Sequence, residues 1–214
     1  GEEYPSNDFL AFYKSGMKDR SLLTGDYADD GWGWRKEGAE KKHWFVAYYC
    51  HWLWSNYILP GVENLSLAYL YTGDEKYARK AIVMLDRIAE MYPAMDHNKQ
   101  SRYAQEFAPN YRGKIVNMIW ETGTMTRLTG AYDNIFDALA KDGVWAGEDS
   151  PLVGKSYADI RANIEENLLR EGVRCIYGGD IRGNYGMHQR ALLRLAIVLQ
   201  DEEISERAID YVLN

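Results

Sequence analysis

A glycine-containing loop meets an apolar helix pattern in the stretch "RGNYGMHQRALLRLAIVLQD", and polar side chains lie close together at this junction. They are Asn184, Tyr185 and His188, with Arg182 just before them. Asn184 and His188 are four residues apart, so even partial helical geometry would put both on one side of the backbone. The competing interpretation is that Asn184 caps the helix and that His188 faces the core.

These residue types suit β-elimination in a uronic-acid polymer. The proton at C5 of a uronate is α to a carboxylate, and it becomes acidic enough only when the charge of that carboxylate is neutralised. Asn, His, Arg or Gln can hold the carboxylate, His or Tyr can take the proton, and Tyr or His can protonate the leaving oxygen. Such a site needs neither a metal nor a cofactor, and we expect none. The predicted catalytic residues are Asn184, Tyr185 and His188.

A second set of polar residues lies in the long stretch from Tyr92 to Gly113, which shows no obvious helix or strand. Loops of this length inside a compact domain are usually functional or disordered. The stretch is rich in Tyr, Arg, Asn and Gln, which favours an ordered binding loop over the alternative of a solvated surface loop. The predicted substrate-binding residues are Gln100, Arg102, Tyr103, Tyr111, Arg112, Trp120, Glu121 and Arg182.

Glu121 lies in the otherwise apolar pattern "NMIWET". A buried glutamate must be paired or protonated, so Glu121 could be a catalytic acid or could anchor an arginine in the core. With a second carboxylate such as Asp180, it could also support glycoside hydrolysis. The sequence leaves these alternatives open.

Composition narrows the class of protein. The 214 residues are 46% hydrophobic and 27% charged, as in a folded protein, and the net charge of -7 argues against a general nucleic-acid binder. No apolar run is long enough to span a membrane. The 17 tyrosines and 7 tryptophans could stack on sugar rings or fill a helical core. The oligomeric state is not predicted.

Helical patterns dominate the elements that must position these residues. One helix is expected from His43 to Tyr57, and a second from Pro60 to a stop at Gly73. A third helix should begin at Asp74, which is its cap. That helix should end at Pro93. A later helix is expected in "KIVNMIWETGTMTRLTGAYDNIFDALAKD", and Gly123 and Gly130 could kink or split it. Another helix should begin at a capping box formed by Ser156 and Asp159. The last two helices are expected in "HQRALLRLAIVLQ" and "ISERAIDYVL". No strand is predicted, so the fold class is all-α, built of antiparallel helical hairpins.

Three fragments together resemble the helical domain of heparinase II/III-like polysaccharide lyases. They are "GWGWRKEGAEKKHWFVAYYCHWLWSNYILPGVENLSLAYLYTGDEKYARKA", "NYRGKIVNMIWET" and "RGNYGMHQRALLRLAIVL", and the resemblance runs from about Asp30 to Asp201. It implies an α/α-toroid followed by a β-sandwich, and cleavage of a heparin-, heparan-, alginate- or ulvan-like polysaccharide by β-elimination. Asn184 and His188 match the positions that meet the substrate carboxylate in this family.

The chain departs from the family in having fewer helices than a complete toroid. We therefore expect residues 1–214 to form one incomplete α/α-toroid, as a fragment of a longer periplasmic or extracellular protein. The tyrosine that exchanges the proton is then either absent from this chain or one of Tyr103, Tyr111 and Tyr185. The alternatives are a glycoside hydrolase on a similar toroid and a non-catalytic glycan-binding domain.

Overall fold

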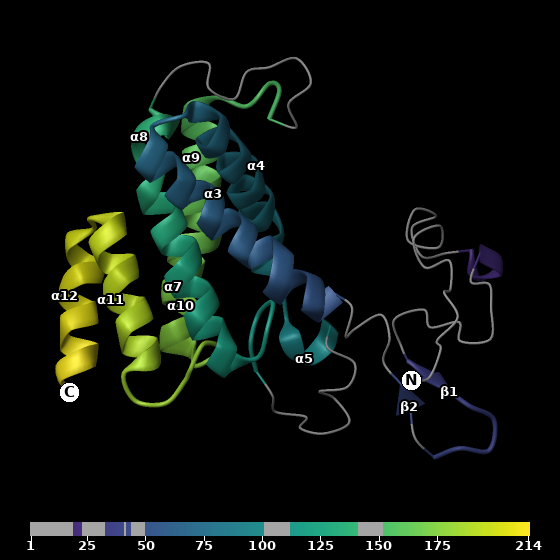
Figure 1. Cartoon of the computed structure of the whole chain (residues 1–214). Coiled ribbons are helices and arrows are strands. Elements are labelled where there is room, and N and C mark those ends of the chain that lie inside the picture. The colour runs from purple at the N-terminus through teal and green to yellow at the C-terminus, as the bar shows by residue number, and fades with distance from the viewer. Residues whose placement is uncertain (1–18, 23–32, 41, 44–49, 101–111, 141–151) are drawn as a thin grey trace.

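The computed structural model describes residues 19–22, 33–40, 42–43, 50–100, 112–140 and 152–214. Three predicted binding residues, Arg102, Tyr103 and Tyr111, lie outside this part of the chain, as does the side chain of Gln100. The described residues are mostly helical, as the sequence predicts (Figure 1). The longer helices are α3 (Leu59–Thr72), α4 (Glu75–Met91), α7 (Met118–Asn134), α9 (Tyr157–Ile164), α10 (Glu171–Gly178), α11 (Met187–Leu199) and α12 (Glu202–Leu213).

Shorter elements connect or extend these helices. Two are π-helical segments, η2 (Trp54–Ile58) and η4 (Glu165–Arg170), and the 3₁₀ turns are η1 (Arg20–Leu22) and η3 (Tyr92–Ala94). Short α-helices are α5 (His97–Gln100) and α8 (Phe136–Leu139). The long stretch after Tyr92 is thus partly structured, because it contains η3 and α5. None of the described helices combines the length and the apolarity needed to cross a membrane.

His43 is not at the start of a helix, which corrects the prediction. It lies in the two-residue strand β2 (Lys42–His43), which pairs antiparallel with β1 (Trp34–Arg35). Trp34 and His43 are direct partners in this hairpin, and their rings are 5.9 Å apart. So short a hairpin carries no alternation of polar and apolar residues, so the sequence pattern could not reveal it.

Pro60 does not separate two helices, which is a second correction. The helix is continuous from residue 50 to residue 72, and it passes through η2 just before Pro60. The N–H of Leu59 bonds to the carbonyl of Trp54, five residues earlier. This wider turn accommodates the proline, which has no N–H to donate and cannot fit a regular helix interior without a kink.

The predicted turn between α3 and α4 is confirmed. Gly73 adopts a left-handed conformation with φ of 67°, and its N–H bonds to the carbonyl of Tyr69. Asp74 then caps α4 by accepting a hydrogen bond from the N–H of Lys76. α4 gives way to a 3₁₀ turn at Tyr92, next to Pro93, as expected. The capping box at Ser156 and Asp159 is also present at the start of α9.

The two glycines of α7 do not divide it. Gly123 and Gly130 both lie inside the continuous helix, and the break comes later, at Ile135, whose φ of -112° and ψ of 5° leave the helical region. α7 begins with Asn117 as its cap, because the side-chain oxygen accepts from the N–H groups of Ile119 and Trp120. The helix start is therefore fixed by the side chain of Asn117.

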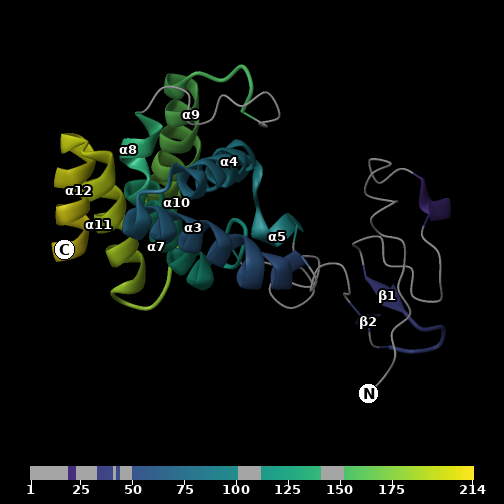
Figure 2. The ribbon, with the colours of Figure 1, turned by 45° about the horizontal axis from the view of Figure 1, so that its top comes forward.

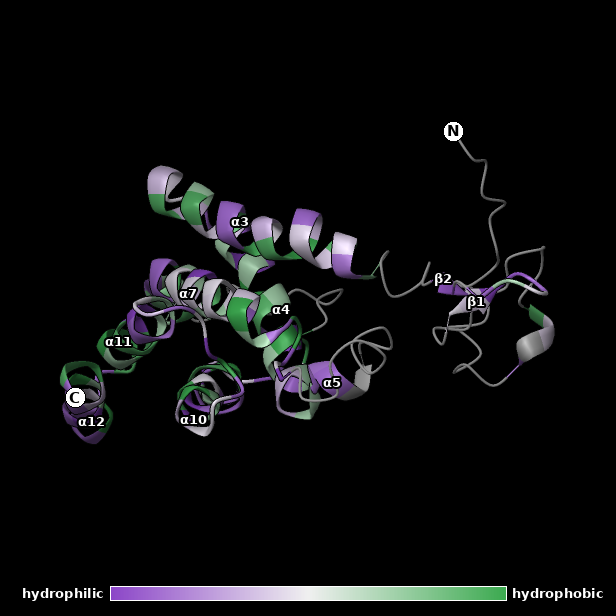
Figure 3. Ribbon diagram, turned by 90° about the horizontal axis from the view of Figure 1, so that it is seen from below, coloured by the Kyte–Doolittle hydropathy of each residue, from purple (hydrophilic) through white to green (hydrophobic). Residues whose placement is uncertain are grey.

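The helices pack as successive hairpins in which α3, α7 and α11 run parallel. Figure 3 shows α7 between α3 and α11, and Figure 2 shows α12 beside α11. Side-chain contacts show that α3 and α7 run in the same direction. Glu63 pairs with Arg127 inside α7, and Tyr69, further along α3, bonds to Asp137 just after α7. Each parallel helix is followed by one that returns, namely α4, the α9–η4–α10 helix and α12.

The core lies between these rows of helices. α4 is joined to α9 by Asp86, which is buried and bonds to Lys155 and Asn163. The largest fully buried side chains include Tyr92, Tyr132, Ile82, Leu85, Met125, Leu128, Ile160, Ile164 and Leu168. Because α3, α7 and α11 are parallel, their N-terminal ends point toward the same end of the bundle.

Candidate functional site

The junction before α11 is held against the start of α7. α10 ends at Gly178 and is followed by the capping residue Gly179, which has φ of 81°. The chain then turns back, since the N–H groups of Asp180 and Ile181 both bond to the carbonyl of Cys175. The next residue, Arg182, donates its N–H to the carbonyl of Met118 at 3.1 Å. This bond places the loop with the catalytic candidates at the N-terminal end of α7.

Asn184 is not the cap of α11. The capping position belongs to Gly186, whose φ of 92° is in the left-handed region. The N–H of Gly186 bonds to the side chain of Gln189 at 2.9 Å, and the backbone carbonyl of Asn184 accepts from Met187. Gly186 therefore makes the turn into α11, and the Asn184 side chain stays exposed.

His188 does not share an open cleft with Asn184, which corrects the central expectation. Its side chain is buried, with an exposed fraction of 7%, and its ring meets that of Tyr211 edge-on at 6.2 Å between centroids. The buried Nδ1 has no hydrogen-bond partner. Burial lowers the pKa of His188, the nearby charge of Arg182 lowers it further, and a bond to the Gly183 backbone opposes both. The core-facing interpretation of His188 is thus the one that the structure supports.

Tyr185 is the most exposed aromatic residue of the junction. Its exposed fraction is 88%, and Arg182 and Asn184 beside it are exposed as well. A phenol, an amide and a guanidinium therefore face solvent within four consecutive residues. Of the three predicted catalytic residues, Asn184 and Tyr185 can reach a ligand in this conformation and His188 cannot.

Glu121 lies wholly inside the protein. Its carboxylate accepts hydrogen bonds from the phenol of Tyr92 at 2.9 Å and from the N–H of Val116 at 2.8 Å. Burial raises its pKa to about 7, although the bonds from Val116, Tyr92 and Ile115 and the charge of Lys114 favour the ionised form. Glu121 is therefore an anchor for the segment before α7. It anchors a phenol and backbone amides instead of an arginine, and it is closed to a substrate.

The segment from Arg112 to Asn117 is tightly packed between α5, α7 and α10. Gly113 pairs with Asn117 in a β-bridge, and its carbonyl accepts from the N–H of His97. The buried Lys114 bonds to the carbonyl of Pro93 and to Glu171 of α10, both within 3.2 Å. The structure thus ties the end of the long stretch to the helical body instead of leaving it as a free surface loop.

Arg112 meets the junction loop directly. Its Nε lies 2.8 Å from Oδ1 of Asp180, and both side chains are partly exposed. The predicted binding residue Arg112 and the predicted hydrolytic acid Asp180 are therefore partners of each other. This pair, with the bond from Arg182 to Met118, brings the two predicted regions together at one end of the bundle.

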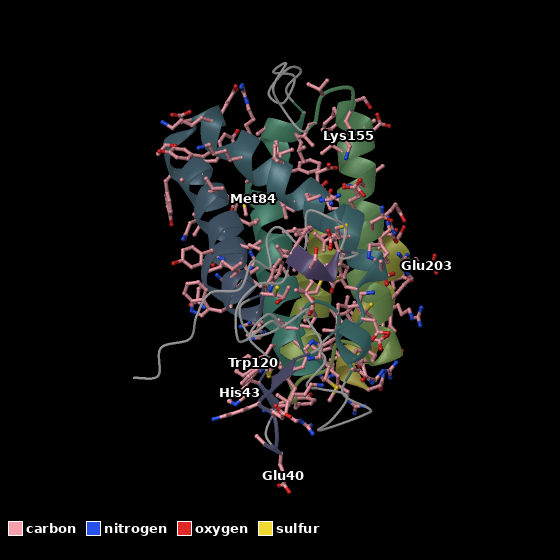
Figure 4. The ribbon with its side chains drawn as sticks, turned by 90° about the vertical axis from the view of Figure 1, so that its right-hand side faces the viewer. Glu40, His43, Met84, Trp120, Lys155 and Glu203 are labelled. Atoms are coloured by element: carbon pink, nitrogen blue, oxygen red, sulfur yellow. The ribbon has the colours of Figure 1, made fainter. Side chains whose placement is uncertain are left out.

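Large aromatic residues are exposed at the same end of three parallel helices. Trp120 opens α7 with 66% of its surface exposed, and Tyr185 precedes α11. Trp52 and Tyr57 precede α3 with 47% and 59% exposed, and their rings are 5.0 Å apart. Figure 4 shows Trp120 near one end of the helical body and Lys155 near the other. We call Trp52, Tyr57, Trp120 and Tyr185 the aromatic end.

Trp52 and Tyr57 were not among the predicted site residues. Both lie in the aromatic stretch from His43 to Tyr57, for which the sequence predicts a helix. A surface helix buries only one stripe, and here Trp54 is buried while Trp52 and Tyr57, which flank it in the sequence, are exposed. A surface helix with aromatic residues on every side cannot bury all of them. This pattern could therefore have predicted that some of the rings face solvent.

No group of His, Cys, Asp and Glu in the described residues is arranged to hold a metal ion. Comparison with protein-family models, with curated proteins and with solved structures finds no significant match to this chain. The resemblance to heparinase II/III-like lyases therefore stays a prediction.

Proposed function

We propose that this chain is the helical part of a polysaccharide lyase that acts on a uronic-acid-bearing glycan. The observation that carries the proposal is the aromatic end, where Trp52, Tyr57, Trp120 and Tyr185 are exposed at the starts of successive parallel helices. Aromatic planes of this kind suit the apolar faces of sugar rings. The successive hairpins are compatible with an incomplete α/α-toroid, and a uronate polymer as substrate implies a periplasmic or extracellular location.

The charged groups at this end favour an anionic glycan. Arg182 is exposed next to Asn184, and Arg112 is partly exposed in its pair with Asp180. The N-terminal ends of α7 and α11 add partial positive charge to the same end of the bundle. These groups together can hold the carboxylate of a uronate.

The elimination itself is assigned to the exposed residues of the junction. Asn184 and Arg182 neutralise the carboxylate, and the Tyr185 phenolate takes the C5 proton. The electrons of that C–H bond form the C4–C5 double bond as the bond from C4 to the leaving oxygen breaks, and the resulting Tyr185 hydroxyl passes the proton to this oxygen. His188 is buried beneath the loop and bonds to the backbone of Gly183.

A non-catalytic glycan-binding domain is the second candidate. The burial of His188 favours it, because the junction then offers a single exposed proton-exchanging side chain, Tyr185, among the described residues. Glycoside hydrolysis is less well supported, because Glu121 is fully buried and Asp180 is engaged by Arg112.

The test measures binding and turnover separately on heparan sulfate, alginate and ulvan. A lyase produces an unsaturated uronate, which is followed by its ultraviolet absorbance, and a hydrolase produces new reducing ends without that absorbance. The expected result is calorimetric binding of at least one of these polymers together with the unsaturated product. Binding without any product would select the glycan-binding domain, and no binding to any uronate polymer would overturn the proposal.

One variant at Tyr185, with a control variant elsewhere, separates stacking from proton transfer. Tyr185→Phe keeps the ring and removes the hydroxyl, so binding should persist while product formation stops. Tyr71→Ala is the matched control, because Tyr71 is similarly exposed, at 82%, but lies near the opposite end of α3. If Tyr185→Phe turned over substrate normally, the proton would have to pass through another residue.

A further inference from the structure

We propose that Arg190 and Arg194 of α11 hold negatively charged groups on glycan units beyond the sugar at the junction. The proposal rests on the proposed function for the kind of polymer, and it adds that the substrate is charged at successive sugars. It begins from the exposed face of α11, where the two arginines are four residues, or about one helical turn, apart.

Neither arginine has a carboxylate partner. Among the described residues, no aspartate or glutamate forms an ion pair with Arg190, Arg194 or Arg182. Other arginines do find such partners, as Arg127 does in Glu63. Acidic residues are not scarce, because the chain has a net charge of -7. The positive charge on this face of α11 is therefore available to a ligand.

The guanidinium of Arg194 is held in place by α7. It lies against Gly130, where a Cβ would overlap Nη2 and Cζ of the arginine. Gly130 is buried inside the helix, so the guanidinium rests on the helix surface where a larger residue would exclude it. A side chain positioned in this way loses less conformational freedom when it binds an anion.

The same face of α7 is open nearer to the aromatic end. Gly123 lies seven residues before Gly130, which is about two helical turns, so both face the same side. A Cβ built at Gly123 meets no other atom within 4 Å. Packing therefore does not require a glycine here, although glycine destabilises a helix interior, and it leaves the backbone open to the close approach of a ligand.

These groups lie along neighbouring parallel helices. Figure 3 shows α7 beside α11. Because the two helices are parallel, Gly123 on one and Arg190 on the other both lie closer to the aromatic end than Gly130 and Arg194 do.

Trp120 connects this surface to the aromatic end. It lies three residues before Gly123, on the same side of α7, and 66% of its surface is exposed. We call Trp120, Gly123, Arg190 and Arg194 the charged strip. A glycan with one sugar on Trp120 can continue past Gly123 with its anionic groups toward the arginines. Guanidinium groups bind carboxylate and similar oxyanions through paired hydrogen bonds, so each arginine can hold a carboxylate or a sulfate.

Removal of the two charges tests the strip. The double variant Arg190→Gln with Arg194→Gln keeps long polar side chains, and its Kd for alginate and heparan sulfate should rise about fivefold in low salt. Added salt should weaken its binding less steeply than that of wild type. Arg79→Gln with Lys80→Gln is the matched control, because it removes the same charge from exposed positions of α4. No loss in the first double variant, or equal losses in both, would overturn the proposal.

Gly123→Leu tests the path of the glycan without changing any charge. Leucine favours a helix more than glycine does, so the midpoint of urea unfolding should not fall. The Kd for the polymer should rise, because the side chain occupies the open space beside α11. Unchanged binding by Gly123→Leu would overturn the placement of the glycan on the charged strip.

The outcomes separate this inference from the proposed function. If wild type bound no uronate polymer, both would fail. If wild type formed the unsaturated product and Trp120→Ala weakened binding, but the arginine variant behaved as wild type, only the charged strip would fail. A loss of alginate binding would assign carboxylates to Arg190 and Arg194, and a loss confined to heparan sulfate would assign sulfates.

Discussion

The N–H of Arg182 donates a hydrogen bond of 3.1 Å to the carbonyl of Met118, and it thereby joins the loop before α11 to the first residue of α7. The two residues are far apart in the sequence, but the bond brings the exposed rings of Trp120 and Tyr185 to neighbouring helix starts. The aromatic end is a consequence of this parallel arrangement of helices.

Trp120→Ala should weaken the binding of a uronate polymer without changing the stability of the fold. An exposed stacking ring contributes about 1 kcal/mol, which corresponds to roughly a fivefold rise in Kd. The free energy of unfolding should change little, because 66% of the side chain surface is exposed. Calorimetry of Trp120→Ala beside Tyr71→Ala checks the effect. Equal losses in both variants would show that binding does not occur at the aromatic end.

Gly123→Ala should stabilise the protein. Gly123 lies inside α7, and a Cβ built there meets no other atom within 4 Å. Alanine in a helix interior is favoured over glycine by about 0.5–1 kcal/mol, so urea unfolding should shift to a higher midpoint.

Gly113→Ala is the contrasting substitution. Its φ of 146° is in a region that side chains rarely adopt, and a Cβ there would overlap the backbone of Val116 and Asn117. The variant should lose more stability than Gly123→Ala gains, and exchange at Val116 should accelerate. A Gly113→Ala protein as stable as wild type would contradict the packing described for this segment.

Glu121 should make the whole protein more stable in mild acid than in mild alkali. Its pKa is raised from 4.5 to about 7 on folding, so the native state binds more protons in this window. The difference corresponds to about 3 kcal/mol of stability that is present at low pH and lost as the pH rises through about 7. Denaturant unfolding of wild type and Glu121→Gln at several pH values measures it. The contribution of Glu121 is the difference between the two curves.

His188 should give the stability of the protein the opposite pH dependence. Burial lowers its pKa below the ordinary value of 6.5, so the unfolded chain binds more protons than the native state in acid. Its contribution to stability is present at neutral pH and is lost as the pH falls below 6.5. His188→Phe keeps a ring against Tyr211 and removes this dependence. If His188→Phe and wild type lost stability in parallel below 6.5, the buried and neutral state of His188 would be wrong.

The local signals in the sequence predicted much of the helical framework. Gly73 and Asp74 define the turn between α3 and α4, and the capping box at Ser156 defines the start of α9. These features depend on residues within a few positions of each other, so their physics is contained in the sequence. The prediction that one helix ends before Pro60 was wrong. The wider π-helical turn η2 accommodates a residue without an N–H, and no local sequence rule predicts such a turn.

The sequence also predicted which residue types form the candidate site, but it did not predict their arrangement in space. Tyr185 and Arg182 are exposed at the predicted junction, whereas His188 turns inward and Glu121 binds backbone amides. Whether a side chain faces the core or the solvent depends on which helix packs against it. The packing of the helices is set by contacts between residues far apart in the sequence. The sequence alone determined which chemical groups this chain brings to the end of its bundle. Only the tertiary structure decided which of them face solvent, because burial is a property of the packed helices together.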